Sequence, residues 1–302
     1  MQYEPRRIDA EERAGVPCGP RMSLLWYIPI GFFAGTYGTI IGAGGGFVIV
    51  PVLMFLFPDD APSVITAASL AVIFVNSASG TIAYARMRRI SYKTGILFAL
   101  ATIPGALLGS RLTSFIPRQE FGAVFGGLLV LAAAFLALTR GRRARSRVNE
   151  KAGEKAGVRA KPAARVVDTV IDRDGNSHPL SYSIPLGMGL SLLIGIVSSL
   201  VGIGGGLIHV PVLTLLFGFP LHIATATSHF VLIFTSLAGV AEHAVDGTWP
   251  RHLLRDVCLA AGVVGGAQLG AFLSRRISAP WIVRGLAIAL GLVGVRLLVS
   301  AF

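Results

Sequence analysis

The 302-residue chain is rich in apolar residues and poor in charge, with 53% hydrophobic and only 14% charged residues. Soluble domains carry about a quarter charged residues, so this composition excludes an ordinary soluble protein. The net charge of +12 comes from basic residues that lie beside apolar segments, which favours contact with membrane lipid over nucleic acid. We therefore expect an all-α, polytopic membrane protein.

A polar tail at 1–22 precedes the first apolar segment and lacks the apolar core of a cleavable signal peptide. The apolar runs that follow reach or approach the length of about 20 residues that a helix needs to cross a bilayer. These runs lie at 24–41, 64–85, 94–115, 121–138, 182–201, 223–241, 257–273 and 279–301. They predict about eight transmembrane helices.

Two glycine-rich breaks interrupt this pattern, and the second repeats the first 160 positions later. One runs from Gly42 to Gly46 and precedes the apolar segment 47–57; the other runs from Gly202 to Gly206 and precedes 207–217. Each segment has 11 residues, too few to span a bilayer as a helix. Paired short segments of this kind are typical of the binding site of a secondary transporter. We expect them to be glycine-broken half-helices.

The two halves share further blocks in the same order. Residues 66–69 (Thr-Ala-Ala-Ser) match 225–228 (Thr-Ala-Thr-Ser), and 105–109 (Gly-Ala-Leu-Leu-Gly) match 266–270 (Gly-Ala-Gln-Leu-Gly). Such matches at a nearly constant offset indicate an internal duplication. We expect a first transmembrane repeat at 23–139 and a second at 182–302, each of four helices.

The stretch 140–181 differs in composition from both repeats. It holds 11 Lys and Arg against 5 Asp and Glu, with little that could form a core. We interpret it as a basic, largely flexible linker between the halves. It lacks interleaved aromatic residues, so a role in binding nucleic acid is disfavoured.

Two arrangements of each half stay open. If the first helix and its half-helix make one crossing, the tail, 86–93, 140–181 and 244–255 share one side and collect 21 Lys and Arg. The positive-inside rule would then place both termini and the linker in the cytoplasm, with the halves parallel. If the two helices form a re-entrant hairpin, each half crosses three times and the halves are inverted. The charge distribution favours the first arrangement.

The glycine breaks suggest a way to bind an anion. The start of a helix exposes backbone N–H groups and the positive end of the helix dipole, and glycine lets a ligand approach the backbone closely. We interpret the breaks, with one serine on each following helix, as a central anion site. Its residues are Gly44, Gly45, Gly46, Ser69, Gly204, Gly205, Gly206 and Ser228. The alternative is that the glycines only allow close helix packing.

Other polar residues interrupt the apolar helices. Asn76, Thr235 and Gln268 are candidates to line the path or to bond another helix. Histidine titrates near neutral pH, so His209 and His229 could couple transport to protons, or could be buried core histidines. The turn at Asp59 and Asp60 is expected to be exposed to water.

These motifs resemble the sulfite exporter TauE/SafE family of membrane permeases. The resemblance rests on the doubled Gly-x-Gly-Gly-Gly, each followed by Val-Pro-Val-Leu at 50–53 and 210–213, with the two pairs of blocks above as support. It covers 24–139 and 182–301. Members are regarded as secondary carriers of sulfite, sulfonates or other small organic anions, generally out of the cell. The first half departs from the pattern, because Ala68 stands where the second half has Thr227.

The resemblance implies a secondary transporter, and we expect an exporter of a small anion in the cell membrane. The alternatives are an anion channel and a carrier of a neutral solute. No enzyme is expected: no Lys-Ser/Thr follows the glycines as in a P-loop, and residue 47 is not the glycine of a dinucleotide motif. No cofactor and no metal are expected, because His and Cys lack ligand spacing. The expected partners are the anion and the bilayer; a homo-oligomer is left open.

Overall fold

The computed structural model describes residues 24–149, 165–171, 177–248, 252–274 and 279–301. Within these ranges the chain is almost entirely helical, so the prediction of an all-α membrane protein is confirmed. The first half holds α1 (Tyr27–Ile41), α2 (Gly46–Leu56), α3 (Pro62–Arg86), α4 (Tyr92–Thr113) and α5 (Arg118–Asn149). The second half holds α6 (Ile184–Val201), α7 (Gly206–Leu215), α8 (Leu221–Val245), α9 (Leu253–Leu273) and α10 (Ala279–Ala301).

Six of the described helices are long and apolar enough to cross a membrane. They are Leu24–Ile41, which adds the short 3-10 turn Leu24–Trp26 to α1, and α3, α4, α6, α8 and α9. The short helices α2 and α7 begin where the glycine breaks were predicted to end. The expected half-helices are therefore present in both halves.

Helices α1 and α2 fold back on each other as a hairpin. The rings of Tyr27, at the start of α1, and Phe57, just after α2, lie 6.4 Å apart. Near the turn, a Cβ added to Gly38 would lie 2.1 Å from the backbone nitrogen of Gly45, so the two helices touch there without side chains between them. The chain leaves α1 through Gly42 (φ 89°) and enters α2 through Gly45 (φ 84°), backbone conformations that glycine adopts without strain.

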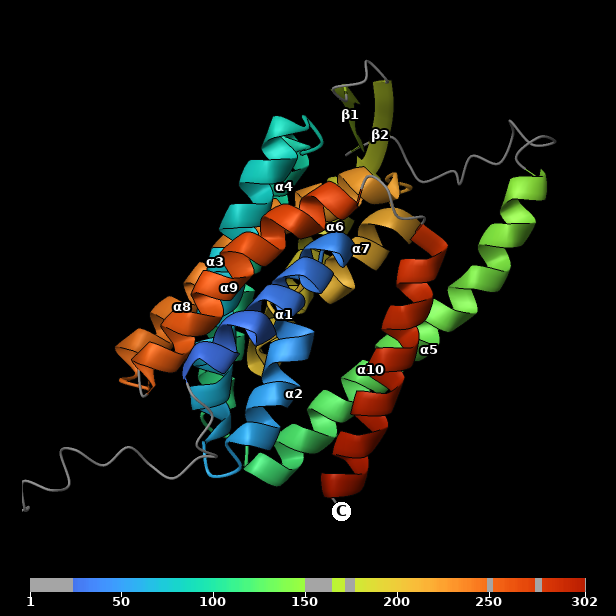
Figure 1. Ribbon diagram of the computed structural model, residues 1–302. Helices are drawn as coiled ribbons and strands as arrows, with labels where there is room; N and C mark the ends of the chain where they lie inside the picture. Colours follow the sequence, from blue (N-terminus) through green and yellow to red (C-terminus); the bar gives the residue numbers. More distant parts are fainter. Residues whose placement is uncertain (1–23, 150–164, 172–176, 249–251, 275–278, 302) are drawn as a thin grey trace, which may run out of the picture.

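Helices α6 and α7 form a second hairpin of the same kind. Gly187, near the start of α6, faces the ring of Phe217, which follows α7. Further in, a hydroxyl–imidazole contact of 3.3 Å joins Ser191 to His209. This hairpin begins beside the β-strands, at the top of Figure 1, whereas α1 begins at the lower end of the molecule.

These hairpins correct the arrangement that the charge distribution favoured. Because α2 returns to the end at which α1 began, α1 and α2 together do not make one crossing. The second arrangement, with hairpins entering from opposite ends, describes the structure. The charge count assumed one crossing for α1 and α2, whereas the hairpin places the start of α1 and the basic loop 86–93 at opposite ends of the bundle. The duplication itself stays a prediction.

The first helix of each half packs against the fourth helix of the other: α1 against α9, and α6 against α4. Cβ atoms added to Gly31 and Gly35 of α1 would lie 2.2 Å from the carbonyl oxygen of Leu259 and 2.8 Å from Cα of Val263 in α9. Cβ atoms added to Gly105 and Gly109 of α4 would each lie 2.2 Å from a carbonyl oxygen of α6. In both pairs the contacts advance in the same direction, so the helices run parallel. Small residues allow this backbone contact, as in many membrane bundles.

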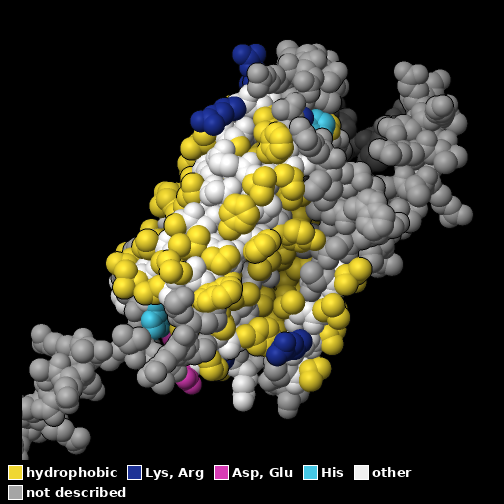
Figure 2. Space-filling view, in the orientation of Figure 1, with side chains coloured by type: hydrophobic (Ala, Val, Ile, Leu, Met, Phe, Trp, Pro, Cys, Tyr) yellow, Lys and Arg dark blue, Asp and Glu magenta, His cyan; other side chains and the backbone are white. Residues whose placement is uncertain are grey.

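Helices α5 and α10 pair with each other to one side of the other helices (Figure 1). Gly126 and Gly294 meet at their crossing, where a Cβ added to Gly126 would lie 2.8 Å from the carbonyl oxygen of Gly294. Figure 2 shows hydrophobic side chains across the middle of one face and Lys or Arg toward its two ends. Exposed Phe33 and Leu131, 71% and 68% accessible, are consistent with a surface that lipid covers.

The range predicted to be a flexible linker contains regular structure at both ends. Helix α5 continues to Asn149, and β1 (Arg165–Ile171) pairs antiparallel with β2 (Ser177–Ser183). Arg and Ala are both good helix formers, so the extension agrees with residue propensity, which an interpretation from charge alone does not consider. The hairpin is held by apolar contacts: Tyr182 packs on Phe98 and Phe217, with ring centroids 5.6 and 5.8 Å apart. Whether 140–181 is flexible as a whole stays a prediction, as do the domain boundaries; its residues 150–164 and 172–176 lie outside the described ranges.

Candidate functional site

The two glycine-rich breaks, Gly42–Gly46 and Gly202–Gly206, form turns that meet in the interior of the helix bundle; they are called the glycine turns below. A Cβ added to Gly206 would lie 2.2 Å from the carbonyl oxygen of Gly42, and one added to Gly46 would lie 2.9 Å from that of Gly202. Real Cβ atoms do not approach backbone so closely, so glycine is required at both positions. The predicted site residues Gly44, Gly45, Gly46, Gly204, Gly205 and Gly206 are thus brought together and are all buried.

Two apolar side chains close the space beside these turns. Gly44 and Gly204 each face Ile73 of α3 and Leu232 of α8, within 3.5 Å of an added Cβ. Ile73 and Leu232 are themselves fully buried. The centre is therefore occluded in this conformation, and close packing explains part of the glycine pattern.

Backbone N–H groups at the start of each short helix have no hydrogen-bond partner among the described residues. In the first turn, the carbonyl of Gly38 accepts from the backbone nitrogens of residues 42, 43 and 44, whereas those of residues 45, 46 and 47 stay without an acceptor. In the second, the carbonyl of Ser198 accepts from residues 203 and 204, and residues 205, 206 and 207 stay without one. Such groups, at the positive end of a helix dipole, are suited to an anion.

The two predicted serines hold the turns from opposite halves. Ser69 of α3 donates its hydroxyl to the carbonyl of Gly202 at 2.7 Å, and Ser228 of α8 donates to that of Gly42 at 3.0 Å. Both side chains are fully buried. Each half therefore fixes the glycine turn of the other half. A direct role in binding substrate stays a prediction.

A polar cluster lies beside the first turn, at the junction of α1, α3 and α8. The Thr39 hydroxyl donates to Oδ1 of Asn76 at 3.4 Å, and Nε2 of His229 lies 3.3 Å from the same hydroxyl. The Tyr84 hydroxyl donates to the Thr39 carbonyl at 2.8 Å, and its ring meets that of His229 edge-on. Two of the predicted residues, Asn76 and His229, are thus joined through Thr39, a residue that the sequence did not single out.

The remaining candidates make separate contacts. Thr235 donates to the carbonyl of Val231 in its own helix at 3.2 Å. Gln268 of α9 donates to the carbonyl and the hydroxyl of Ser79 in α3, at 2.8 and 2.9 Å. His209 lies against Ser191, away from the cluster of His229. A role of Thr235, Gln268 or His209 in transport stays a prediction.

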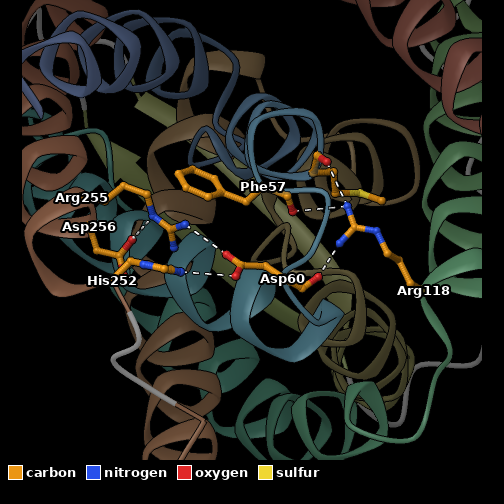
Figure 3. A network of polar contacts seen from close by, with 7 residues as sticks. Phe57, Asp60, Arg118, His252, Arg255 and Asp256 are labelled. Atoms are coloured by element: carbon orange, nitrogen blue, oxygen red, sulfur yellow. Dashed lines mark hydrogen bonds and ion pairs between the residues drawn. The ribbon is translucent and has the colours of Figure 1, made fainter. Parts of the chain in front are cut away.

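A buried ionic network at one end of the bundle was not predicted (Figure 3). Asp60, in the turn after α2, lies 3.3 Å from both Arg255 and His252 at the start of α9. Arg255 also pairs with Asp256 at 3.0 Å and lies 4.5 Å above the ring of Phe57. Asp60 is only 9% exposed, so the expectation that this turn is open to water is wrong for Asp60, although Asp59 is exposed.

Arg118, the first residue of α5, extends the network to a third element. Its guanidinium donates to the carbonyls of Met54, in the last turn of α2, and of Phe57 and Asp60, which follow that helix. A cation is favourable there, because the last carbonyls of a helix lack intrahelical partners and carry partial negative charge. The sequence offered one signal, two adjacent aspartates after a half-helix, but not their partners.

Comparison with known proteins gives a consistent result. A family model described as sulfite exporter TauE/SafE matches residues 27–297. The probable membrane transporter protein YunE of Bacillus subtilis is 33% identical over 92% of this chain and 98% of its own length. A probable membrane transporter protein of Methanocaldococcus jannaschii is 24% identical over 90% of this chain and 94% of its own. A probable membrane transporter protein of Xylella fastidiosa is 26% identical over 85% of this chain and 87% of its own length. No solved structure matches the chain.

Proposed function

Since the chain belongs to the sulfite exporter TauE/SafE family and is a membrane transporter rather than an enzyme, we propose that it is a secondary carrier of a small anion. The substrate class is sulfite, a sulfonate or another small organosulfur or organic anion, and the direction is export. The central anion site consists of the two glycine turns, with Ser69 and Ser228 beside them.

One observation carries this proposal. The two turns meet, and the first amides of both α2 and α7 lack hydrogen-bond acceptors among the described residues. Two helix starts attract an anion without the cost of placing a cationic side chain in the membrane interior. Sulfite and sulfonates present several acceptor oxygens to such donors.

The occluded centre favours a carrier over the alternative of a channel. Ile73 and Leu232 cover the turns, and the turns touch each other, so substrate could reach the amides only after the halves move. A carrier needs such a closed state for alternating access. A carrier of a neutral solute would use the same closure but would not need the paired helix starts.

Proton coupling is assigned to His209 and His229. Both side chains are buried, and Nε2 of each lies 3.3 Å from a hydroxyl, that of Ser191 for His209 and that of Thr39 for His229. A buried imidazole can take up a proton when a conformational change exposes it to water or when a bound anion lies beside it. The proton would then cross with the anion or against it.

We expect His209→Gln to flatten the pH dependence of transport. Glutamine keeps a polar group near Ser191, which lies 3.3 Å from the imidazole, but it does not titrate. The measurement is the initial rate of sulfite flux across the range pH 5.5 to 8 (roughly the range in which histidine titrates). His222→Gln, at a partly exposed histidine, is the matched control. A profile identical to that of the unaltered protein would return His209 to a packing role.

The membrane is proposed to be the cell membrane, with the linker on the cytoplasmic side. The stretch 86–93, from the last residue of α3 to the start of α4, carries Arg86, Arg88, Arg89 and Lys93. It lies at the same end of the bundle as the β-hairpin. The positive-inside rule assigns this end to the cytoplasm. The proposed partners are the anion and the lipid bilayer; nucleic acid is not among them, and a homo-oligomer stays open.

The test is flux of labelled sulfite in liposomes that contain the purified protein. Sulfonates, sulfate and small carboxylates are added as competitors, with and without a pH gradient. Saturable flux that one group of anions blocks and that responds to the gradient is the expected result. Flux that no anion inhibits would contradict an anion carrier, and continuous current without saturation would support the channel.

A further inference from the structure

One buried amide in the polar cluster has no partner for its donor end. Asn76 lies on α3 and is fully buried. Its Oδ1 accepts from Thr39, whereas its Nδ2 has no hydrogen-bond partner among the described residues. An unpaired buried donor costs about 1–3 kcal/mol, and more in the membrane interior, where water does not compensate it. A buried donor that stays unpaired at this cost in stability is a candidate to donate a hydrogen bond to a ligand.

The surroundings fix this amide in place. His229 of α8 bonds the hydroxyl of Thr39 in α1, and that hydroxyl in turn bonds Oδ1 of Asn76. Three helices from both halves thus hold its orientation. Gly35 and Gly80 keep room for it: Cβ atoms added there would lie 3.0 Å from Oδ1 of Asn76 and 2.6 Å from the imidazole of His229.

The cluster has no equivalent in the other half. The position that corresponds to Asn76 is Thr235, whose hydroxyl is satisfied by its own helix. The position that corresponds to His229 is Leu70, which is apolar and fully buried. The unpaired amide of Asn76 therefore has no counterpart at the corresponding position of the second half, although the glycine turns are alike.

We propose that Asn76 is a substrate-binding residue that donates a hydrogen bond from Nδ2 to an oxygen of a small oxyanion, with Thr39 and His229 as positioning residues. This inference rests on the proposed function and adds an asymmetric binding element to the paired glycine turns. The substrate thereby has one preferred orientation between the halves. Sulfite, sulfonate and carboxylate groups all offer an acceptor oxygen of this kind.

The test is binding of sulfite to the purified full-length protein, measured by titration calorimetry, with thermal unfolding measured in parallel. Asn76→Leu keeps a similar volume but removes the donor. We expect its dissociation constant to rise by about tenfold or more, as for loss of a hydrogen bond to a charged group. We expect its unfolding temperature to stay equal or to rise, because an unpaired buried donor is removed. Thr102→Val in α4, which removes a fully buried hydroxyl that bonds its own helix, is the matched control and should leave the dissociation constant unchanged.

Other outcomes separate this inference from the proposed function. If the unaltered protein binds sulfite and Asn76→Leu binds it equally well, the role of Asn76 is overturned while the anion carrier stands. If the unaltered protein binds neither sulfite nor any other small anion, both the role of Asn76 and the proposed anion carrier are contradicted. If Asn76→Leu does not fold, Asn76→Ala provides the same comparison with a smaller side chain. Equal loss of affinity in Thr235→Val, at the corresponding position of the second half, would overturn the asymmetry.

Discussion

We expect Gly206→Ala to abolish sulfite flux and to lower stability by about 1–3 kcal/mol, as overpacking of a tight interior does. The added methyl group would lie 2.2 Å from the carbonyl oxygen of Gly42 and 2.7 Å from Cα of Ala43, so the two glycine turns must separate. Alanine is otherwise favoured over glycine in a helix, so the loss is steric. The measurements are initial flux in liposomes and thermal unfolding in detergent.

The matched control is Gly189→Ala in α6. A Cβ added there meets no atom within 4 Å, and the residue is helical like Gly206. This variant should transport normally and be slightly more stable. If Gly206→Ala transported at the same rate as Gly189→Ala, contact between the two turns would not be needed for transport.

The second large effect is expected at the ionic network shown in Figure 3. Asp60→Ala should destabilise the protein by about 3–5 kcal/mol, because it leaves buried Arg255 without one of its two carboxylate partners. Nη2 of Arg255 already lacks a partner among the described residues. The measurement is the unfolding temperature of the purified protein.

Asp59→Ala provides the control, because Asp59 precedes Asp60 in the same turn but is exposed. Exposed charges contribute about 0–1 kcal/mol, so its unfolding temperature should barely change. Replacing both members of the buried pair, as in Asp60→Asn with Arg255→Gln, should recover part of the loss. Equal shifts for Asp59→Ala and Asp60→Ala would show that the buried pair does not stabilise the fold.

The fold class could be predicted because its signals are local. Apolar runs identify helices in a membrane protein, and each glycine break marks where a helix ends and a shorter one begins. The hairpins could not be predicted in the same way. Whether α2 continues away from α1 or returns along it depends on tertiary contacts, such as that between Tyr27 and Phe57. Charge counting cannot detect such a contact.

The candidate site was predictable in position but not in its bonds. Polar residues on apolar helices were expected to face the interior, and Ser69 and Asn76 are indeed buried. Their partners lie far away in sequence: Ser69 bonds Gly202, 133 positions later. Asp60 and Arg255 are separated by 195 positions. Without the fold, nothing in the sequence pairs such residues.

The central claim is that the meeting glycine turns form the anion site of an alternating-access carrier. Counterflow tests it most directly: liposomes loaded with unlabelled sulfite are diluted into labelled sulfite, with Gly206→Ala and Gly189→Ala compared side by side. The predicted result is transient accumulation of label inside above its equilibrium level, in the unaltered protein and in Gly189→Ala but not in Gly206→Ala. Monotonic equilibration without an overshoot, or an equal overshoot in Gly206→Ala, would contradict it.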